Sequence, residues 1–346
     1  MCDQIEPESI PRVIVSEKAR RILENIKRVA VHSGDLDGIC SAAILLLLSQ
    51  SIKIDFLSVT EAKKAPAIYD LVVDLPKIGN AINIDHHETN YEYLSKYNLL
   101  EEKDLVDPNA PSATELLAKY FNLENDDHIR KITNIANLAD LNEFTEEIYL
   151  IDKVIKCHSR DPDALMKIAL AIAKYGDEFL KDFWLRSQVS RLEPLLEKCS
   201  KFSSYIIDET IKKRDSRAVV LHVESGIPRV CINDILHDFL EAGGQAIVLI
   251  NTIHENDIYC PSLATDIGKQ SARISMRVRK ANINAGQFLS LFGGGGHKCA
   301  AGAKLSIEML PEFLLEVFKL LSMEFGCVLY LNINKKILSN VFQSEL

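Results

Sequence analysis

Four short segments in the first half of the chain place acidic and imidazole side chains directly after apolar runs. They are His32-Ser33-Gly34-Asp35-Leu36-Asp37, then Asp74, then Asp85-His86-His87, and then Asp140. Carboxylates and imidazoles are costly to gather inside a protein unless a cation neutralises the carboxylates. Their repeated occurrence after apolar runs therefore predicts a metal site.

The ligand types indicate which metal and which chemistry. Carboxylates mixed with imidazole suit a divalent first-row ion such as Mn²⁺ better than Ca²⁺, and they offer too many oxygens for a structural zinc site. Two ions roughly 3.5 to 4 Å apart would lower the pKa of a shared water and stabilise the oxygens of an in-line displacement at phosphorus. The predicted reaction is phosphoester hydrolysis. The candidate ligands, enough for two ions if one aspartate bridges, are His32, Asp35, Asp37, Asp74, His86 and Asp140.

The elements around these residues predict how they meet. Short β-branched runs alternate with a segment of helical length and composition, which is typical of a parallel sheet. Ligands bind outside the carboxyl ends of such strands, and the first three acidic clusters follow their strands directly. We therefore expect them to converge. The expected strands are 29–31, 52–59, 71–73 and 82–84, with a helix at 38–50.

Further along the chain the pattern becomes helical and then returns to strands. Ser112 and Glu115 form a capping pattern for a helix at 112–121, and Pro194 should kink or split a later helix. We predict an α/β fold, in which an N-terminal parallel-sheet domain is joined by a helical linker to a smaller α/β C-terminal domain, with the active site in the cleft between the domains. The other expected helices are 161–175, 176–201 and 233–242, the later strands 218–223 and 246–250, and the domains 1–185, 186–212 (the connector) and 213–346.

A glycine tetrad followed by histidine marks the second domain. Such a run alone is more often a turn than an anion site, but this one follows a basic stretch, and residues 267–306 contain no Asp or Glu. The net charge of −9 argues against general affinity for nucleic acid, yet this local distribution lets one face receive a polyanion. The segment predicted to cradle a phosphate is Gly293-Gly294-Gly295-Gly296-His297.

Composition sets the remaining expectations. With 346 residues, 47% of them hydrophobic and 26% charged, the chain is expected to be a soluble globular protein. Residues 42–48 form a purely apolar stretch much too short to cross a bilayer, and residues 1–20 do not resemble a secretory signal, so we expect no membrane association and a cytoplasmic location. The eight cysteines form no CxxC pair and are expected to be reduced core residues.

These motifs together resemble the DHH phosphoesterase superfamily, which is named for the triplet found here as Asp85-His86-His87. The segment 35–38 is similar to the first family motif, Asp74 to the second and Asp140 to the fourth. Arg277 and the segment 292–302 resemble the DHH-associated substrate domain of the RecJ-like and nanoRNase branch.

The resemblance implies a role for each candidate residue. It implies two Mn²⁺ ions, for which Mg²⁺ could substitute, with Asp74 bridging between them. His87 would contact the scissile phosphate, and Asp85 would orient its neighbours. The implied ligands are Asp37, Asp74, His86 and Asp140 around one ion and His32, Asp35 and Asp74 around the other, while Arg277, Gly293, Gly294, Gly295, Gly296 and His297 would hold a terminal phosphate or the product.

Three functions are compatible with these residues. The first is an Mn²⁺-dependent phosphodiesterase or exonuclease acting on the ends of single-stranded DNA or RNA, or on short oligonucleotides. The second is a small-molecule phosphoesterase for a dinucleotide or nucleoside bisphosphate, and the third is a RecJ-like subunit of an archaeal replication complex that binds a GINS-type partner. The sequence leaves open DNA against RNA, cleavage polarity, substrate length, homodimer formation and replication or repair partners.

Overall fold

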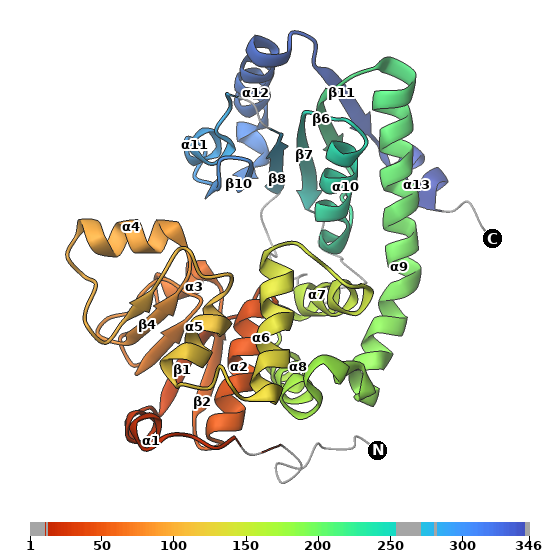
Figure 1. Ribbon diagram of the computed structural model, residues 1–346. Coiled ribbons are helices and arrows are strands. Elements are labelled where there is room, and N and C mark those ends of the chain that lie inside the picture. Colours follow the sequence, from red (N-terminus) through yellow and green to blue (C-terminus); the bar gives the residue numbers. More distant parts are fainter. Residues whose placement is uncertain (1–10, 12, 254–270, 280–281, 343–346) are drawn as a thin grey trace. The chain divides into compact units, whose positions relative to one another are not determined.

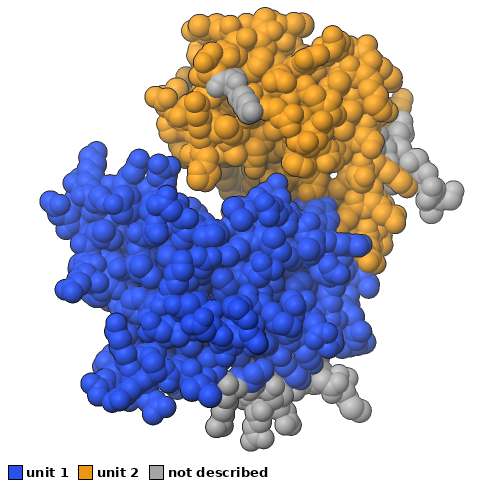
Figure 2. Space-filling view, in the orientation of Figure 1, with its two compact units in different colours: residues 1–190 blue, residues 191–346 orange. Residues whose placement is uncertain are grey.

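The computed structural model describes residues 11, 13–253, 271–279 and 282–342. The chain divides into two compact units, residues 1–190 and 191–346, which are coloured separately in Figure 2. Each unit contains its own β-sheet. The α/β fold class predicted from the sequence is confirmed.

The first unit is built on a five-stranded sheet in the order β2-β1-β3-β4-β5. Every neighbouring pair is parallel, as the alternation of strands and helix predicted. The carboxyl ends of β1, β3 and β4 are therefore neighbours at one edge. The strands are β1 (Arg28–His32), β2 (Lys53–Leu57), β3 (Leu71–Val73), β4 (Ile82–Asp85) and β5 (Leu105–Val106).

One buried helix connects this sheet to the helical part of the unit. The helix α2 (Leu36–Leu48) is apolar along almost its whole length and packs against α5, α6 and α8 (Figure 1). A helix that is apolar on all sides is buried in a core, so its neighbours fix the position of α2. Its first turn lies at the carboxyl edge of the sheet. The remaining helices are α1 (Glu17–Glu24), α3 (Val59–Ala62), α4 (Glu88–Lys96), α5 (Ala113–Tyr120), α6 (Asp127–Asp140), α7 (Glu146–His158) and α8 (Pro162–Tyr175).

The helix expected at 176–201 differs from the prediction. Gly176–Lys181 is a 3₁₀ helix, and α9 then runs as one element over Phe183–Ile207, with Pro194 inside it. Of the predicted kink or split at Pro194, the split is wrong, because α9 continues through the proline. Leu192 and Leu195, on either side of it, are buried, and their packing stabilises the helix despite the hydrogen bond that proline cannot donate. None of the described helices combines the length and apolar composition needed to cross a membrane.

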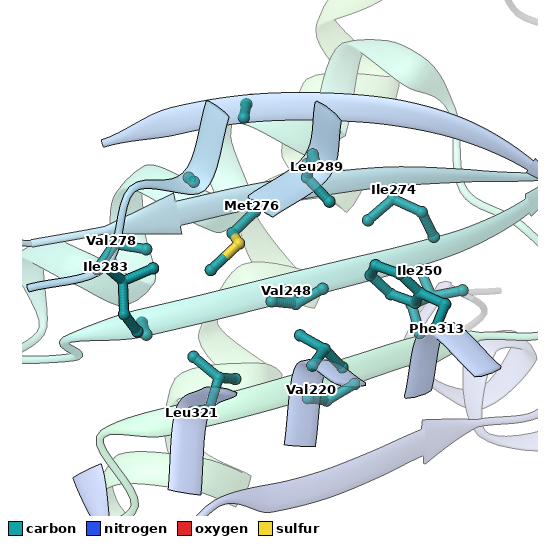
Figure 3. Packing of buried hydrophobic residues seen from close by; sticks show 14 of the residues in the cluster. Val220, Val248, Ile250, Ile274, Met276, Val278, Ile283, Leu289, Phe313 and Leu321 are labelled. Carbon is teal, nitrogen blue, oxygen red and sulfur yellow. The ribbon is translucent and has the colours of Figure 1, made fainter. Parts of the chain in front are cut away.

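The second unit has a mixed six-stranded sheet in the order β11-β6-β7-β8-β10-β9. The strands β11, β6 and β7 are parallel, and β8, β10 and β9 continue antiparallel. Figure 3 shows Val220, Val248 and Met276 of one sheet face packed with Phe313 and Leu321 of α12. The elements are β6 (Ala218–Val223), α10 (Arg229–Glu241), β7 (Ala246–Ile253), β8 (Ser271–Val278), α11 (Ala285–Ser290), β9 (Gly295–Gly296), β10 (Ala300–Ser306), α12 (Leu310–Phe325), β11 (Leu329–Ile333) and α13 (Lys335–Phe342).

The cysteines correct another expectation. Cys199 of α9 and Cys231 of α10 form a disulfide, Cys157 is also disulfide-bonded, and Cys299 and Cys327 are exposed. The prediction of reduced core cysteines holds for Cys40, which is free and buried, and is wrong for the other described cysteines. Cys2 and Cys260 lie outside the described residues. Cys199 and Cys231 are 32 residues apart in sequence and come within 5.1 Å (Cα to Cα) only through the packing of the two helices, which the spacing of cysteines does not reveal.

Candidate metal centre

The predicted residues of the first unit meet at the carboxyl edge of β1, β3 and β4. His32 is the last residue of β1, Asp74 follows β3, and Asp85 ends β4 directly before His86 and His87. Asp140 is the last residue of α6. The edge of the sheet thus gathers three of the four acidic segments, and α6 brings the fourth.

The start of α2 supplies two more carboxylates. Asp35 is the N-cap of α2, and its Oδ1 accepts a hydrogen bond of 3.2 Å from the amide of Gly38. Asp37 lies in the first helical turn and is 1% exposed. A Cβ at Gly38 would lie 2.1 Å from the carbonyl oxygen of His32, so only glycine lets the helix start this close to β1. This close approach brings His32 and the two aspartates together.

Asp37 is held by the N-terminus of α5. Its Oδ2 accepts from the amide of Ala113 at 2.7 Å, and its Oδ1 accepts from the amide and hydroxyl of Thr114 at 2.8 and 2.6 Å. Burial, together with the charges of Asp74 and Asp140, raises the pKa of Asp37 well above its ordinary value. The sequence pointed to this helix start through Ser112, but not to the contact between its amides and Asp37.

Asp74 is the group of the cluster whose buried charge most needs a partner. It is 2% exposed, its backbone φ is +58°, and neither carboxylate oxygen has a hydrogen-bond partner among the described residues. Burial and the nearby charge of Asp35 raise the pKa of Asp74 to about 7. His32 Nδ1 lies 2.7 Å from Asp35 Oδ2 and 3.3 Å from Asp74 Oδ2 without forming a regular hydrogen bond. These orphaned buried atoms fit a bound cation.

His86 presents one ring nitrogen to the carboxylates. Its Nδ1 lies 3.3 Å from the carbonyl oxygen of Ala110, which can only accept, so the hydrogen of the neutral ring belongs on Nδ1 and the lone pair on Nε2. Nε2 is 3.2 Å from Asp140 Oδ2, 3.7 Å from Asp37 Oδ2 and 4.0 Å from Asp74 Oδ1. Although burial opposes it, the hydrogen bond with Asp140 and the charge of Asp37 raise the pKa of His86 to about 10. A proton and a cation would compete for Nε2.

His87 and Asp85 form a hydrogen-bonded pair that borders the cluster, with His87 Nδ1 3.5 Å from Asp74 Oδ1. His87 Nδ1 lies 2.8 Å from Asp85 Oδ1, and this hydrogen bond raises the pKa of His87 to about 9. The side chain of His87 is 41% exposed, whereas that of Asp85 is 1% exposed. Asp85 is thus a buried anchor, and His87 reaches outward from it.

The donor atoms form three overlapping sets, each with its ligand atoms within 4.8 Å of one another. Asp74 belongs to two of these sets and lies near the remaining one through His86. A set of imidazole nitrogens and carboxylate oxygens can hold Mn²⁺ or Mg²⁺. The structure brings all six predicted ligands together, and the sets are His32, Asp35 and Asp74; Asp37, His86 and Asp140; and Asp74, His86 and His87.

In the second unit, strand pairing brings Arg277 next to the glycine tetrad. Arg277 of β8 is paired with Ala300 of β10, and the carbonyl oxygen of Ala300 accepts from the amide of His297 at 2.7 Å. Arg277 Nη2 donates to Asn233 Oδ1 of α10 at 3.2 Å, a contact that the sequence did not indicate. The predicted phosphate-holding residues therefore lie in one place on this unit.

The glycines of the tetrad serve the turn in different ways. Gly293 and Gly296 have φ of +73° and +139°, and a Cβ at Gly296 would lie 2.5 Å from the carbonyl oxygen of Ala300. A Cβ at Gly294 would lie 2.4 Å from the carbonyl oxygen of Gly302, whereas one at Gly295 would meet nothing within 4 Å. Three of the four glycines are thus explained by the backbone of the turn, and Gly295 is not.

Comparison with known proteins finds one matching domain family. Residues 215–323 match the DHHA1 domain family, and no curated protein sequence matches the chain. The second unit thus contains the DHH-associated domain that Arg277 and the segment 292–302 predicted.

Three solved structures show the shared fold. PggH from Vibrio cholerae, a pGpG-specific phosphodiesterase, is similar with a TM-score of 0.55 and 16% identity over 86% of this chain and 99% of that chain. RecJ from Thermus thermophilus in complex with Mg²⁺ is similar with a TM-score of 0.53 and 17% identity. The match covers 94% of this chain and 56% of that chain. The manganese-bound exonuclease RecJ is similar with a TM-score of 0.52 and 17% identity. The match covers 88% of this chain and 94% of that chain.

Proposed function

We propose that this protein is a metal-dependent phosphodiesterase that hydrolyses the ends of single-stranded DNA or RNA, or short oligonucleotides. The observation that carries the proposal is Asp74. Its buried carboxylate forms no regular hydrogen bond with the described residues and belongs to two overlapping donor sets. We infer that the ions are two Mn²⁺, for which Mg²⁺ could substitute. When bound, such ions supply an activated water and neutralise charge on the phosphoryl oxygens.

The side chain proposed to act directly on the substrate is His87, which is held by Asp85. Because Nδ1 of His87 is hydrogen-bonded to Asp85, Nε2 is the ring atom that would contact the phosphate. The raised pKa of His87 keeps this ring protonated near neutral pH, so Nε2 would donate a hydrogen bond to a phosphoryl oxygen. Asp85 would hold the ring orientation during this contact.

The second unit would supply the anchor for the substrate. Arg277 provides a guanidinium suited to bidentate phosphate binding, and the tetrad with His297 lies beside it. The amides of Gly293, Gly294 and His297 donate to backbone carbonyl oxygens, so the guanidinium and not these amides is the group available to a phosphate. A terminal phosphate bound by Arg277 would favour an end-acting enzyme over an internal nuclease.

A second candidate is a dinucleotide phosphodiesterase. Its support is the likeness to the pGpG-specific phosphodiesterase, of which this chain covers 99%. The manganese-bound exonuclease RecJ is covered to 94%, so the two candidates are separated by experiment and not by coverage. A homodimer, a GINS-type partner and a cytoplasmic location stay predictions.

The test is a time course with Mn²⁺ on 5′-labelled and 3′-labelled DNA and RNA strands of two and twenty nucleotides, with pGpG as a separate arm. We expect stepwise release of mononucleotides that Asp74→Asn abolishes. Release from dinucleotides alone would select the second candidate. Absence of release from every substrate, with Mn²⁺ or Mg²⁺, would refute the proposal.

A further inference from the structure

Two buried asparagines form a hydrogen-bonded chain behind the site. Asn83 of β4 is 0% exposed and Asn90 of α4 is 7% exposed. Asn90 Nδ2 donates to Asp85 Oδ2 at 2.6 Å and to Asn83 Oδ1 at 2.9 Å, and Asn83 Nδ2 donates to the carbonyl oxygen of Leu75 at 3.0 Å. Since the Leu75 carbonyl and the carboxylate of Asp85 only accept, the orientation of both amides is determined by the network.

One end of the chain fixes Asp85. Its Oδ1 accepts from the amides of His86 and His87 at 2.8 and 3.3 Å and contacts the His87 ring, whereas Oδ2 accepts from Asn90. With donors on both oxygens, the carboxylate cannot rotate without breaking a buried hydrogen bond. Asn90 therefore keeps Oδ1 directed at His87, whose ring is 41% exposed and makes an edge contact with the ring of His86 at 4.7 Å between centroids.

The other end of the chain fixes the turn at Asp74. Leu75, whose carbonyl accepts from Asn83, directly follows Asp74, and the amide of Asp74 donates to the carbonyl of Ile84 at 2.9 Å. The turn is thus tied to β4 by one bond from a side chain and one from the backbone. Asp74 has a left-handed φ of +58°, a conformation that needs such support.

We propose that Asn90 is a positioning residue for His87, acting through Asp85, and that Asn83 braces the turn that presents Asp74. The proposal rests on the proposed function for the role of His87. It assigns different consequences to two asparagines that touch each other. Loss of Asn90 acts on turnover, and loss of Asn83 acts on metal affinity.

The test compares Asn90→Leu and Asn83→Leu, which keep the approximate size of the side chain and remove its polar atoms. The control is Asn251→Leu in the second unit, where a 4% exposed asparagine bonds the amide and carbonyl of Ile227 at 2.8 and 3.0 Å. Turnover of bis(p-nitrophenyl) phosphate and of a labelled dinucleotide, Mn²⁺ affinity by calorimetry, and urea stability are measured for each variant.

For Asn90→Leu we expect kcat to fall about 10- to 100-fold, with KM and Mn²⁺ affinity within about threefold of wild type. Asn90→Ser, which keeps a donor, should recover part of the loss. For Asn83→Leu we expect Mn²⁺ affinity to fall about 10- to 100-fold and kcat at saturating Mn²⁺ to change less than in Asn90→Leu. Asn251→Leu should lose stability only.

The outcomes separate this proposal from the proposed function. If Asn90→Leu turns over like Asn251→Leu, or loses Mn²⁺ affinity as Asn83→Leu does, the positioning role is overturned. If the wild type hydrolyses no diester, the proposed function fails, and the structural claims are decided by calorimetry and by the NMR signal of the His87 Nδ1 proton. That signal should be present in the wild type and lost in Asn90→Leu, and its persistence overturns the proposal.

Discussion

Replacing Asp74 by asparagine should make the metal-free protein more stable while removing its response to metal. The carboxylate of Asp74 is buried without a hydrogen-bond partner among the described residues, so its charge is unfavourable unless a cation is bound. Asparagine has the same shape and tolerates the left-handed φ of +58° that alanine would strain. The substitution therefore removes the charge and keeps the turn.

The size of the effect follows from the pKa of Asp74, which is raised from 3.8 to about 7 in the folded protein. Below a pH of about 4 the carboxyl is protonated in both the folded and the unfolded chain, and it has no effect on stability. As the pH rises from about 4 to about 7, the unfolded chain ionises first, so the folded protein loses stability. Above a pH of about 7 the full cost applies, about 4 kcal/mol at about 1.4 kcal/mol per pKa unit.

Urea unfolding in EDTA at pH 5 and pH 8 measures this cost. We expect Asp74→Asn to exceed the wild type in free energy of unfolding by about 1 to 2 kcal/mol at pH 5 and by about 4 kcal/mol at pH 8. Adding Mn²⁺ should stabilise the wild type and leave the variant unchanged. A variant that is less stable than the wild type at pH 8 in EDTA, or that keeps the response to Mn²⁺, would show that Asp74 is not a ligand waiting for a cation.

The remaining predictions concern the other residues of the proposed mechanism. His87→Gln should lower kcat about 10²- to 10⁴-fold and preserve stabilisation by Mn²⁺, because the ring acts on substrate; calorimetry and steady-state kinetics check both. Arg277→Ala should raise KM for oligonucleotides about 10- to 100-fold, since one charge-assisted contact of about 1.5 to 3 kcal/mol is lost, with kcat at saturation nearly unchanged. Gly296→Ala should destabilise the protein to urea by about 1 to 3 kcal/mol because of its φ of +139°, whereas Gly295→Ala, with open space around its Cβ, should unfold like the wild type.

Much of the site could be predicted because the topology of a parallel sheet determines where the residues after its strands lie. Once β-branched runs indicate neighbouring parallel strands, residues that follow them must meet at one edge, and this places His32, Asp74 and His86 together whatever the loops between them do. What the sequence could not indicate depends on contacts between distant elements. Asn83 in a strand has no local rationale, and Asp37 finds its donors on a helix 76 residues away.

The two histidines that follow β4 show how one short motif yields two functions. His86 has its Nδ1 beside a neutral carbonyl and directs Nε2 to three carboxylates, so its ring is suited to share a cation with them. His87 has its Nδ1 on the buried carboxylate of Asp85, which favours the protonated ring and orients it toward solvent. The difference therefore comes from the partner of Nδ1. It follows that His86→Gln should abolish Mn²⁺ stabilisation whereas His87→Gln should not, and equal loss in both would contradict this division of roles.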